Sequence, residues 1–213
     1  DVYKRQLFSC VREEMTCDKE LIVVQRIGEG GYVYTRGAAI SSNTDLKEET
    51  FGLYGSLTPN ASVPQPYFNA SATVNADLTA TISPLQYWPG LLNASMKFFS
   101  WYPYSDANAP TASFTDPGEM VLNYTANASA ANHVDVLAAI SGPVWVEGVN
   151  IHFYRTLTKV TFTFKKVAPV PDEVTLEKIE FQNVGKSGKL AMTEIPTTTT
   201  KNGKPKFVWS DVA

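Results

Sequence analysis

The longest aromatic run in the chain spans residues 87–104 and carries large side chains on both faces of a predicted strand. Its Phe, Trp and Tyr content favours a strand over a helix, and alternation places Phe98 and Phe99 on opposite faces. A strand that is apolar on both faces belongs inside a sheet that packs on a second layer. Pro89 and Pro103 are expected to mark its ends, because proline cannot donate to a sheet ladder.

Other apolar segments are short, alternate with polar residues and are separated by turn signals, which is typical of strands. Residues 149–164 alternate most clearly and predict two consecutive strands, whereas residues 133–140 are ambiguous between a strand and a short helix, and residues 105–118 are rich in turn residues. Further strands are predicted at residues 21–27, 50–56, 67–69, 78–82, 119–124, 143–147, 174–183 (with Ile179 buried) and 207–209. This pattern, without an amphipathic helix, predicts an all-β protein built as an antiparallel β-sandwich.

The first predicted strand is compact and is followed at once by a glycine-rich break at residues 28–31. We expect Leu21, Val23 and Ile27 to share its buried face. Arg36, followed by Gly37, lies beside the break, where a protease has access to the chain. The apolar residues of the strand are Leu21, Ile22, Val23, Val24 and Ile27.

Composition narrows the class of protein. The 213 residues are 44% hydrophobic and 12% aromatic but only 18% charged, below the roughly 25% of an average soluble domain. This profile suits a β-rich extracytoplasmic protein. The net charge of -3 leaves no basic surface for nucleic acid, and no apolar run approaches the length of roughly 18 residues that a transmembrane helix requires.

Both cysteines, Cys10 and Cys17, lie near the start of the chain. A disulfide between them would close only a short loop and stabilise little of the fold. Residues 7–10, Leu-Phe-Ser-Cys, instead resemble a lipobox, the lipoprotein cleavage site whose cysteine becomes lipidated. The polar residues 11–20 then suit a tether between a lipid anchor and a folded domain.

The sequence contains no recognisable motif of an enzyme active site. The two histidines, His133 and His152, lie in no recognisable catalytic motif, and His152 is expected on an exposed sheet face. His133 and Asp135 form a pair that falls short of a metal site. Carboxylates are plentiful, so a pair for glycoside hydrolysis stays open, although none stands out. We predict no catalytic, cofactor or metal site, since the glycine break also lacks the pattern of a phosphate loop.

Exposed aromatic residues offer an alternative function. Trp88, Trp101, Tyr102 and Tyr104 could stack on sugars if they faced solvent, although core packing is the commoner fate of such residues. The alternative to the function considered next is therefore an outer-membrane lipoprotein that binds glycans through these aromatics.

Several segments, in this order and spacing, resemble the fimbrillin family, the subunits of type V pili of Gram-negative anaerobes. The resemblance covers most of the chain from about Leu21 onward. The segments are Thr-Arg-Gly at 35–37, Phe-Gly-Leu-Tyr at 51–54, Tyr-Trp-Pro at 87–89, residues 96–103, residues 134–138 and residues 149–160.

The resemblance implies a transthyretin-like N-terminal fimbrillin domain, export as a lipoprotein to the outer membrane and cell surface, and assembly by donor-strand exchange. Cys10 would be lipidated, an arginine-specific protease would cut between Arg36 and Gly37, and residues 21–27 would be the displaced strand. Partners would be other fimbrial subunits and that protease, with host proteins or glycans left open. The domains would be a signal remnant and tether at 1–20, the fimbrillin-like domain at 21–185, and at 186–213 its end or the start of a second domain.

Overall fold

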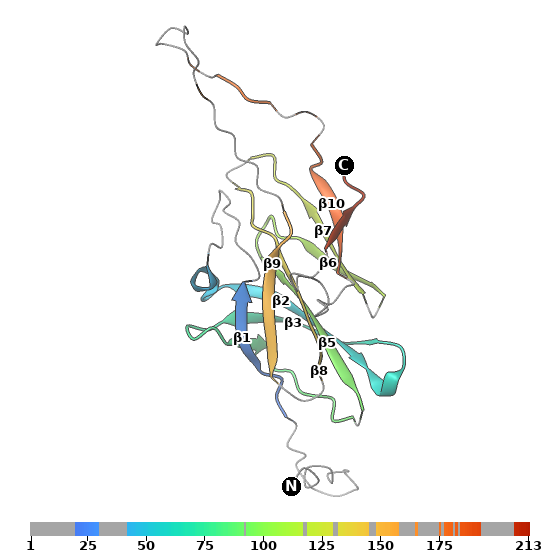
Figure 1. The fold of residues 1–213 in the computed structure, drawn as a ribbon. Helices are drawn as coiled ribbons and strands as arrows, with labels where there is room; N and C mark the ends of the chain where they lie inside the picture. Colours follow the sequence, from blue (N-terminus) through green and yellow to red (C-terminus); the bar gives the residue numbers. More distant parts are fainter. Residues whose placement is uncertain are drawn as a thin grey trace, which may run out of the picture.

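The computed structural model describes residues 20–29, 42–91, 93–116, 119–129, 132–144, 148–157, 165, 175, 177–180, 182, 184–192 and 207–213. In this part of the chain the only helices are two short 3-10 turns, η2 (Asn43–Leu46) and η3 (Pro59–Ala61). The predicted all-β class is therefore confirmed. The strands (Figure 1) are β1 (Val24–Glu29), β2 (Thr50–Thr58), β3 (Gln65–Val74), β4 (Ala80–Ser83), β5 (Ser95–Tyr102), β6 (Thr111–Asp116), β7 (Glu119–Thr125), β8 (Leu137–Val144), β9 (Val149–Arg155), β10 (Ser187–Met192) and β11 (Val208–Ser210).

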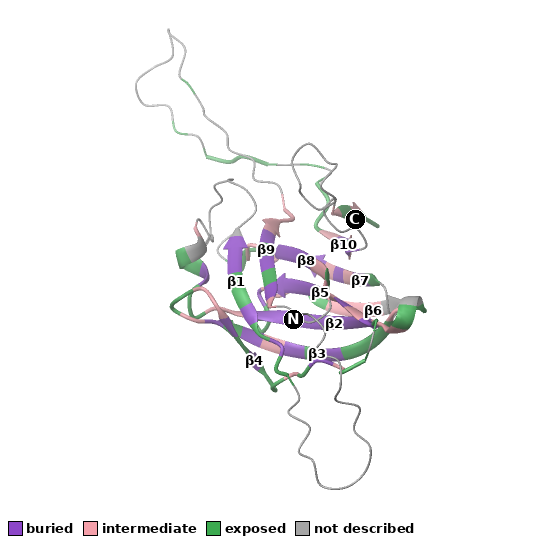
Figure 2. Ribbon diagram, turned by 60° about the horizontal axis from the view of Figure 1, so that its bottom comes forward, coloured by how far each residue is buried: buried purple, intermediate pink, exposed green. Residues whose placement is uncertain are grey.

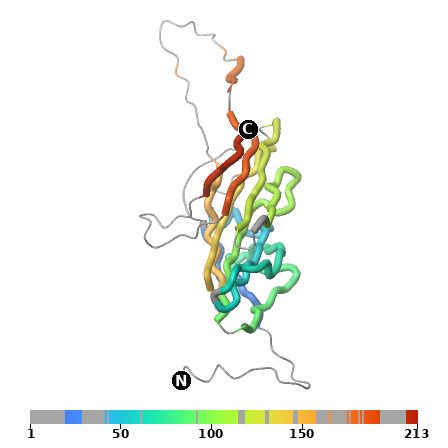
Figure 3. The backbone as a smooth tube through the Cα atoms, turned by 90° about the vertical axis from the view of Figure 1, so that its right-hand side faces the viewer, coloured from blue at the N-terminus to red at the C-terminus, as the bar shows by residue number. Residues whose placement is uncertain are grey.

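The strands form two sheets, and the larger one closes into a barrel in the order β1-β4-β3-β2-β5-β8-β9. Its neighbouring strands are antiparallel except for β1 and β9, which run parallel. The smaller sheet has the order β11-β10-β7-β6. Figures 1 and 3 place β1 and the C-terminal strands in different parts of the molecule. The sequence predicted an antiparallel β-sandwich. The two sheets are observed, but the larger one is closed and contains one parallel pair, because β1 pairs with both β4 and β9.

Each face of β5 supports a different hydrophobic core, as the aromatic run predicted. Met96 and Phe98 face the barrel interior, where they pack with buried residues of the other barrel strands. Phe99 and Trp101 point outward and pack with β7 and β10 of the smaller sheet, including Leu122. Consecutive residues, and not only alternate ones, are therefore buried in β5 and its neighbouring strands, which are largely purple in Figure 2. The barrel and the smaller sheet form two layers, and the smaller sheet packs against the outer face of β5.

A glycine makes room for the largest side chain of the second core. Gly52 on β2 is paired with Trp101 on β5, and a Cβ at this glycine would lie 2.1 Å from Trp101 Cε2. Because real Cβ atoms do not approach other atoms so closely, only glycine lets the indole ring pack this close to the backbone of β2. Trp101 is consequently 3% exposed.

Most predicted strands are confirmed, but several predictions are wrong. β5 begins at Ser95, so Pro89 does not mark its start, although Pro103 follows its end. The turn-rich stretch contains β6, and residues 143–144 end β8 instead of starting a new strand. The described positions of residues 174–183 lie in no strand, and Ile179 is 47% exposed. β6 and β10 were missed because short strands that carry Ser, Thr and Gly resemble loops.

Candidate functional site

The barrel is closed by the segment 20–29, which forms backbone hydrogen bonds on both sides. One side pairs with residues 86–88 and with β4, and the other pairs with β9. Deleting this segment would leave the facing edges of β4 and β9 without partners. The bonds outside the regular ladders run from Ile22 N to Gln86 O (2.9 Å), Trp88 N to Glu20 O (2.9 Å), Ile27 N to Leu78 O (2.8 Å) and Val149 N to Val23 O (2.9 Å).

The buried face of this segment differs from the predicted one. Leu21 and Val23 are 41% and 49% exposed, whereas Ile22, Val24 and Ile27 are buried. Ile22 and Val24 share a face because side chains alternate along a strand. The pairing with β9 shifts register directly after Val24, and this bulge returns Ile27 to the interior where strict alternation would have turned it outward. The prediction was therefore out of phase by one residue at its start.

The three buried residues belong to the core of the barrel. They pack in one cluster with Ile82 and Ala80 of β4 and with Val149 and Ile151 of β9. Fully burying such side chains contributes about 1.5–3 kcal/mol each. The segment thus supplies a substantial share of the stability of a domain, which is typically about 5–15 kcal/mol.

On the outer face of the closing strand, a histidine covers a glycine. Gly28 pairs with His152 of β9, and a Cβ at Gly28 would lie 2.6 Å from His152 Nδ1. The prediction that His152 lies on an exposed sheet face is confirmed. The glycine that looked like part of a flexible break is instead a strand position that fits beneath the imidazole ring.

The predicted lipidation and processing residues, Cys10, Arg36 and Gly37, lie outside the described residues. Their roles stay predictions. In the chain, Arg36 falls between Glu29, the last residue of β1, and Ser42, which precedes η2. A cut at that bond would separate β1 covalently from every other described strand.

The tryptophans proposed for sugar stacking are core residues. Trp88 is 8% exposed and contacts Phe98 edge-on at 6.0 Å between ring centroids, and Trp101 is 3% exposed. Tyr102 is half-buried and Tyr104 is 39% exposed. The alternative of an exposed platform therefore does not apply to either tryptophan, because both fill cores, the commoner fate expected from the sequence.

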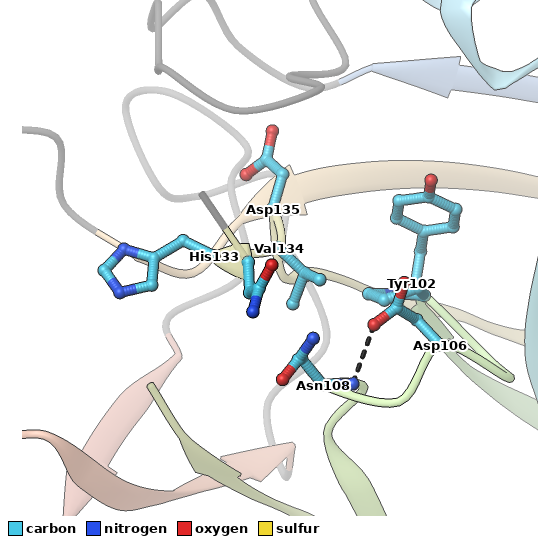
Figure 4. A pocket seen from close by; sticks show the side chains of 8 residues that line it. Tyr102, Asp106, Asn108, His133, Val134 and Asp135 are labelled. Atoms are coloured by element: carbon cyan, nitrogen blue, oxygen red, sulfur yellow. Dashed lines mark hydrogen bonds between the residues drawn. The ribbon is translucent and has the colours of Figure 1, made fainter. Parts of the chain in front are cut away.

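His133 and Asp135 do not converge on a common point. His133 Nε2 donates to Asn127 O at 2.8 Å, and Figure 4 shows its ring pointing away from the other labelled side chains. Asp135 instead accepts from Arg155 Nε at 2.9 Å, in an ion pair whose side chains are each 6% exposed. In the described part of the chain, no group of three or more His, Cys, Asp or Glu side chains could hold a metal ion.

A polar pocket of about 270 Å³ lies where two crossovers between the sheets meet. The crossover from β5 to β6 contributes Asp106 and Asn108, and the crossover from β7 to β8 contributes Asn132, Val134 and Asp135 (Figure 4). Sequence reasoning missed this site because the two crossovers are distant in the chain. Of the lining residues, sequence reasoning singled out Tyr102, His133 and Asp135 as candidate functional residues, but it considered Tyr102 apart from the other two.

The surroundings of Tyr102, at the edge of this pocket, are negatively charged. Its hydroxyl donates to Glu49 Oε2 at 3.0 Å. Burial raises the pKa of Tyr102 strongly, and the hydrogen bond and charge of Glu49 and the charges of Asp135 and Asp106 raise this pKa further. The field at the pocket therefore favours neutral or positively charged groups over anions.

A family model described as fimbrillin-like matches residues 35–210. The chain belongs to the fimbrillin-like family. The family resemblance stated from the sequence is thereby confirmed, and no curated protein or solved structure gives a significant match. The matched region contains all strands from β2 to β11, whereas β1 precedes it.

Membership in the fimbrillin-like family points to a structural subunit of a cell-surface fimbria, which assembles with other fimbrial subunits, and not to an enzyme. Within the residues that the structure describes, no helix combines the length and apolar character needed to cross a membrane.

Proposed function

We propose that this fimbrillin-like protein is exported to the outer membrane as a lipoprotein through Cys10, is cut after Arg36 and assembles by donor-strand exchange. In this scheme residues 21–27, with the rest of β1, leave the domain, and a strand from another subunit takes their place. The transthyretin-like sandwich expected of the family is part of the same proposal.

The observation that carries the proposal is the position of β1 as the closing strand of the barrel. β1 contributes Val24 and Ile27 to the core, the residues just before it add Ile22, and β1 satisfies backbone groups on β4 and β9. Its loss would open an apolar groove between two bare strand edges. Such edges readily pair with an added strand, which supplies new ladder hydrogen bonds and new side chains for the groove.

The proposal can be tested by locking β1 to β9. Arg26 and Asn150 are exposed and paired in register, so Arg26→Cys with Asn150→Cys would form a removable disulfide. The matched control is Thr50→Cys with Thr73→Cys, because these side chains face each other across β2 and β3 with their hydroxyls 3.1 Å apart. Both are made in the full chain with Cys10→Ser and Cys17→Ser.

Each protein is treated with an arginine-specific protease, its new N-terminus is read, and polymers are sought by electron microscopy. We expect a cut that exposes Gly37 in all proteins. Filaments should form from the unlocked and control proteins, and from the β1-locked protein only after a reductant is added. Filaments from the oxidised β1-locked protein, or a cut protein that stays a monomer as stable as its precursor, would contradict the proposal.

A further inference from the structure

The pocket at the two crossovers is held in shape by a single asparagine. Asn127 Nδ2 donates to Asn108 Oδ1 at 2.7 Å, and Asn127 O accepts from His133 Nε2 at 2.8 Å. Asn127 Oδ1 also accepts from Ser129 N at 2.8 Å. Asn127 therefore links the described parts of both crossovers, and such links reduce the cost of ordering side chains when a ligand binds.

Three polar side chains of the pocket retain unused hydrogen-bonding capacity. Asp106 Oδ1 accepts from Asn108 N at 2.7 Å, and its second oxygen accepts no hydrogen bond from the described residues. The oxygen of the Asn108 side chain is occupied by Asn127, so its Nδ2 group is left as a donor. The side-chain amide of Asn132 likewise makes no hydrogen bond within the described part of the chain.

Apolar groups lie among these polar groups. The side chain of Val134 points between those of Asn108 and Asp106 in Figure 4, and Pro103 and Tyr102 also line the pocket. Among the described residues, the lining carboxylates are those of Asp106 and Asp135, and of these two Asp135 is paired with a cation of the described part, Arg155. The pocket therefore presents adjacent donors and acceptors, a small apolar surface and a negative field.

We propose that this pocket binds one neutral sugar unit of a glycan. Asp106 would accept from a ring hydroxyl, the amides of Asn108 and Asn132 would bond the neighbouring hydroxyls, and Val134 and Pro103 would contact the C–H face of the ring. The volume of about 270 Å³ is just below the roughly 300–1,000 Å³ of sites for drug-sized ligands, which suits a single sugar unit. The charge of Asp106 disfavours acidic sugars.

The test is a titration of the full chain by amide NMR with methyl β-D-galactopyranoside, methyl α-D-mannopyranoside and N-acetyl-D-glucosamine. We expect at least one of them to shift the amide signals of Asn108, Asn132 and Val134 in a saturable way, with a Kd of about 1–10 mM, the affinity of a few polar contacts.

Asp106→Asn is the diagnostic variant. It keeps an oxygen that can accept from Asn108 N, and therefore keeps the turn, but it loses the carboxylate. We expect the Kd to rise about tenfold. Asp77→Asn is the matched control, because Asp77 accepts from Thr79 N at 3.0 Å in a similar turn outside the pocket. This variant should bind as the parent does.

Four results would overturn the inference. The first is the absence of a saturable shift with all three sugars, and the second is an unchanged Kd in Asp106→Asn. The third is equally tight binding of N-acetylneuraminic acid, because a carboxylate ligand should be repelled by Asp106. The fourth is a saturable shift at these amides with calcium chloride alone, because the pocket would then be a cation site. None of these outcomes depends on whether β1 is exchanged.

Discussion

Two tyrosines show how differently a buried hydroxyl can affect the fold. Tyr54 is 2% exposed, and its ring stacks on Phe114 at 4.0 Å between centroids. Its hydroxyl is buried and has no hydrogen-bond partner in the described part of the chain. The hydroxyl of Tyr102 is also part-buried but donates to Glu49. Within the described residues, the Tyr54 hydroxyl has therefore lost its hydrogen bonds to water and gained none in return, whereas the Tyr102 hydroxyl bonds to Glu49.

Tyr54→Phe should therefore raise the free energy of unfolding by about 1 kcal/mol, because it removes an unsatisfied group and keeps the ring. Tyr102→Phe, the matched control, should lower it by about 1–2 kcal/mol, because Glu49 loses its donor. Urea unfolding at neutral pH measures both. A loss of stability in Tyr54→Phe as large as in Tyr102→Phe would contradict this account.

The Tyr54 hydroxyl also makes the free energy of unfolding depend on pH. Burial raises the pKa of Tyr54 above its ordinary value of 10.0, so the unfolded chain releases this proton at a lower pH than the folded chain does. Ionisation of Tyr54 therefore leaves the free energy of unfolding unchanged below pH 10 and lowers it as the pH rises further. The decline in unfolding free energy above pH 10 should accordingly be shallower in Tyr54→Phe than in the parent.

At the scale of elements, β1 shows where pattern reasoning succeeds and where it fails. The apolar stretch located the strand, but a shift of one residue reverses which side chains are buried. The bulge after Val24 is a property of the pairing with β9 and leaves no mark in a single sequence. β5 was easier to predict. It carries large apolar residues on both faces, and these are favourable only where the strand has a packed layer on each side.

The phase of β1 can be tested with two adjacent residues of the same type. Val24 is fully buried and Val23 is 49% exposed. Val24→Thr should lower the free energy of unfolding by about 1–3 kcal/mol because it places a hydroxyl in the core, whereas Val23→Thr should change it by less than about 0.5 kcal/mol. Chemical denaturation of the uncut chain measures both, and the reverse order would restore the phase expected from the sequence.

The pocket lay beyond sequence reasoning for a different reason. Asp106 and Asn132 are each unremarkable within their own stretches of chain. They become neighbours only because β6 and β7 form part of a second sheet, so that the chain leaves the barrel and returns to it at the same end. Predicting such a site requires the order of strands in both sheets, which local patterns do not determine.

At the scale of the whole molecule, the two cores are coupled through shared strands. β5 sends alternate side chains into each, and Trp209 of β11 donates through Nε1 to Thr156 O, beyond the end of β9, at 2.7 Å. Losing either core would expose one face of β5. The barrel and the smaller sheet should therefore unfold together as one cooperative unit.

Leu122→Ala tests this coupling from the smaller sheet. Leu122 is fully buried in the second core, so its truncation should lower the free energy of unfolding by about 2–5 kcal/mol. If the unit is cooperative, hydrogen exchange should accelerate by the same factor at the most protected amides of β5 and of β10. Protection lost in β10 alone would show that the smaller sheet unfolds independently.

The closed sheet has an odd number of strands, and strand directions cannot alternate all the way around an odd ring. At least one neighbouring pair must be parallel, and here it is β1 with β9. Without β1, the remaining six alternate perfectly, and the gap is flanked by strands of opposite direction. A replacement strand would make one parallel and one antiparallel ladder whichever way it entered. Parity thus leaves the direction of a closing strand undecided, and side-chain fit, including the small residue beneath His152, must decide it.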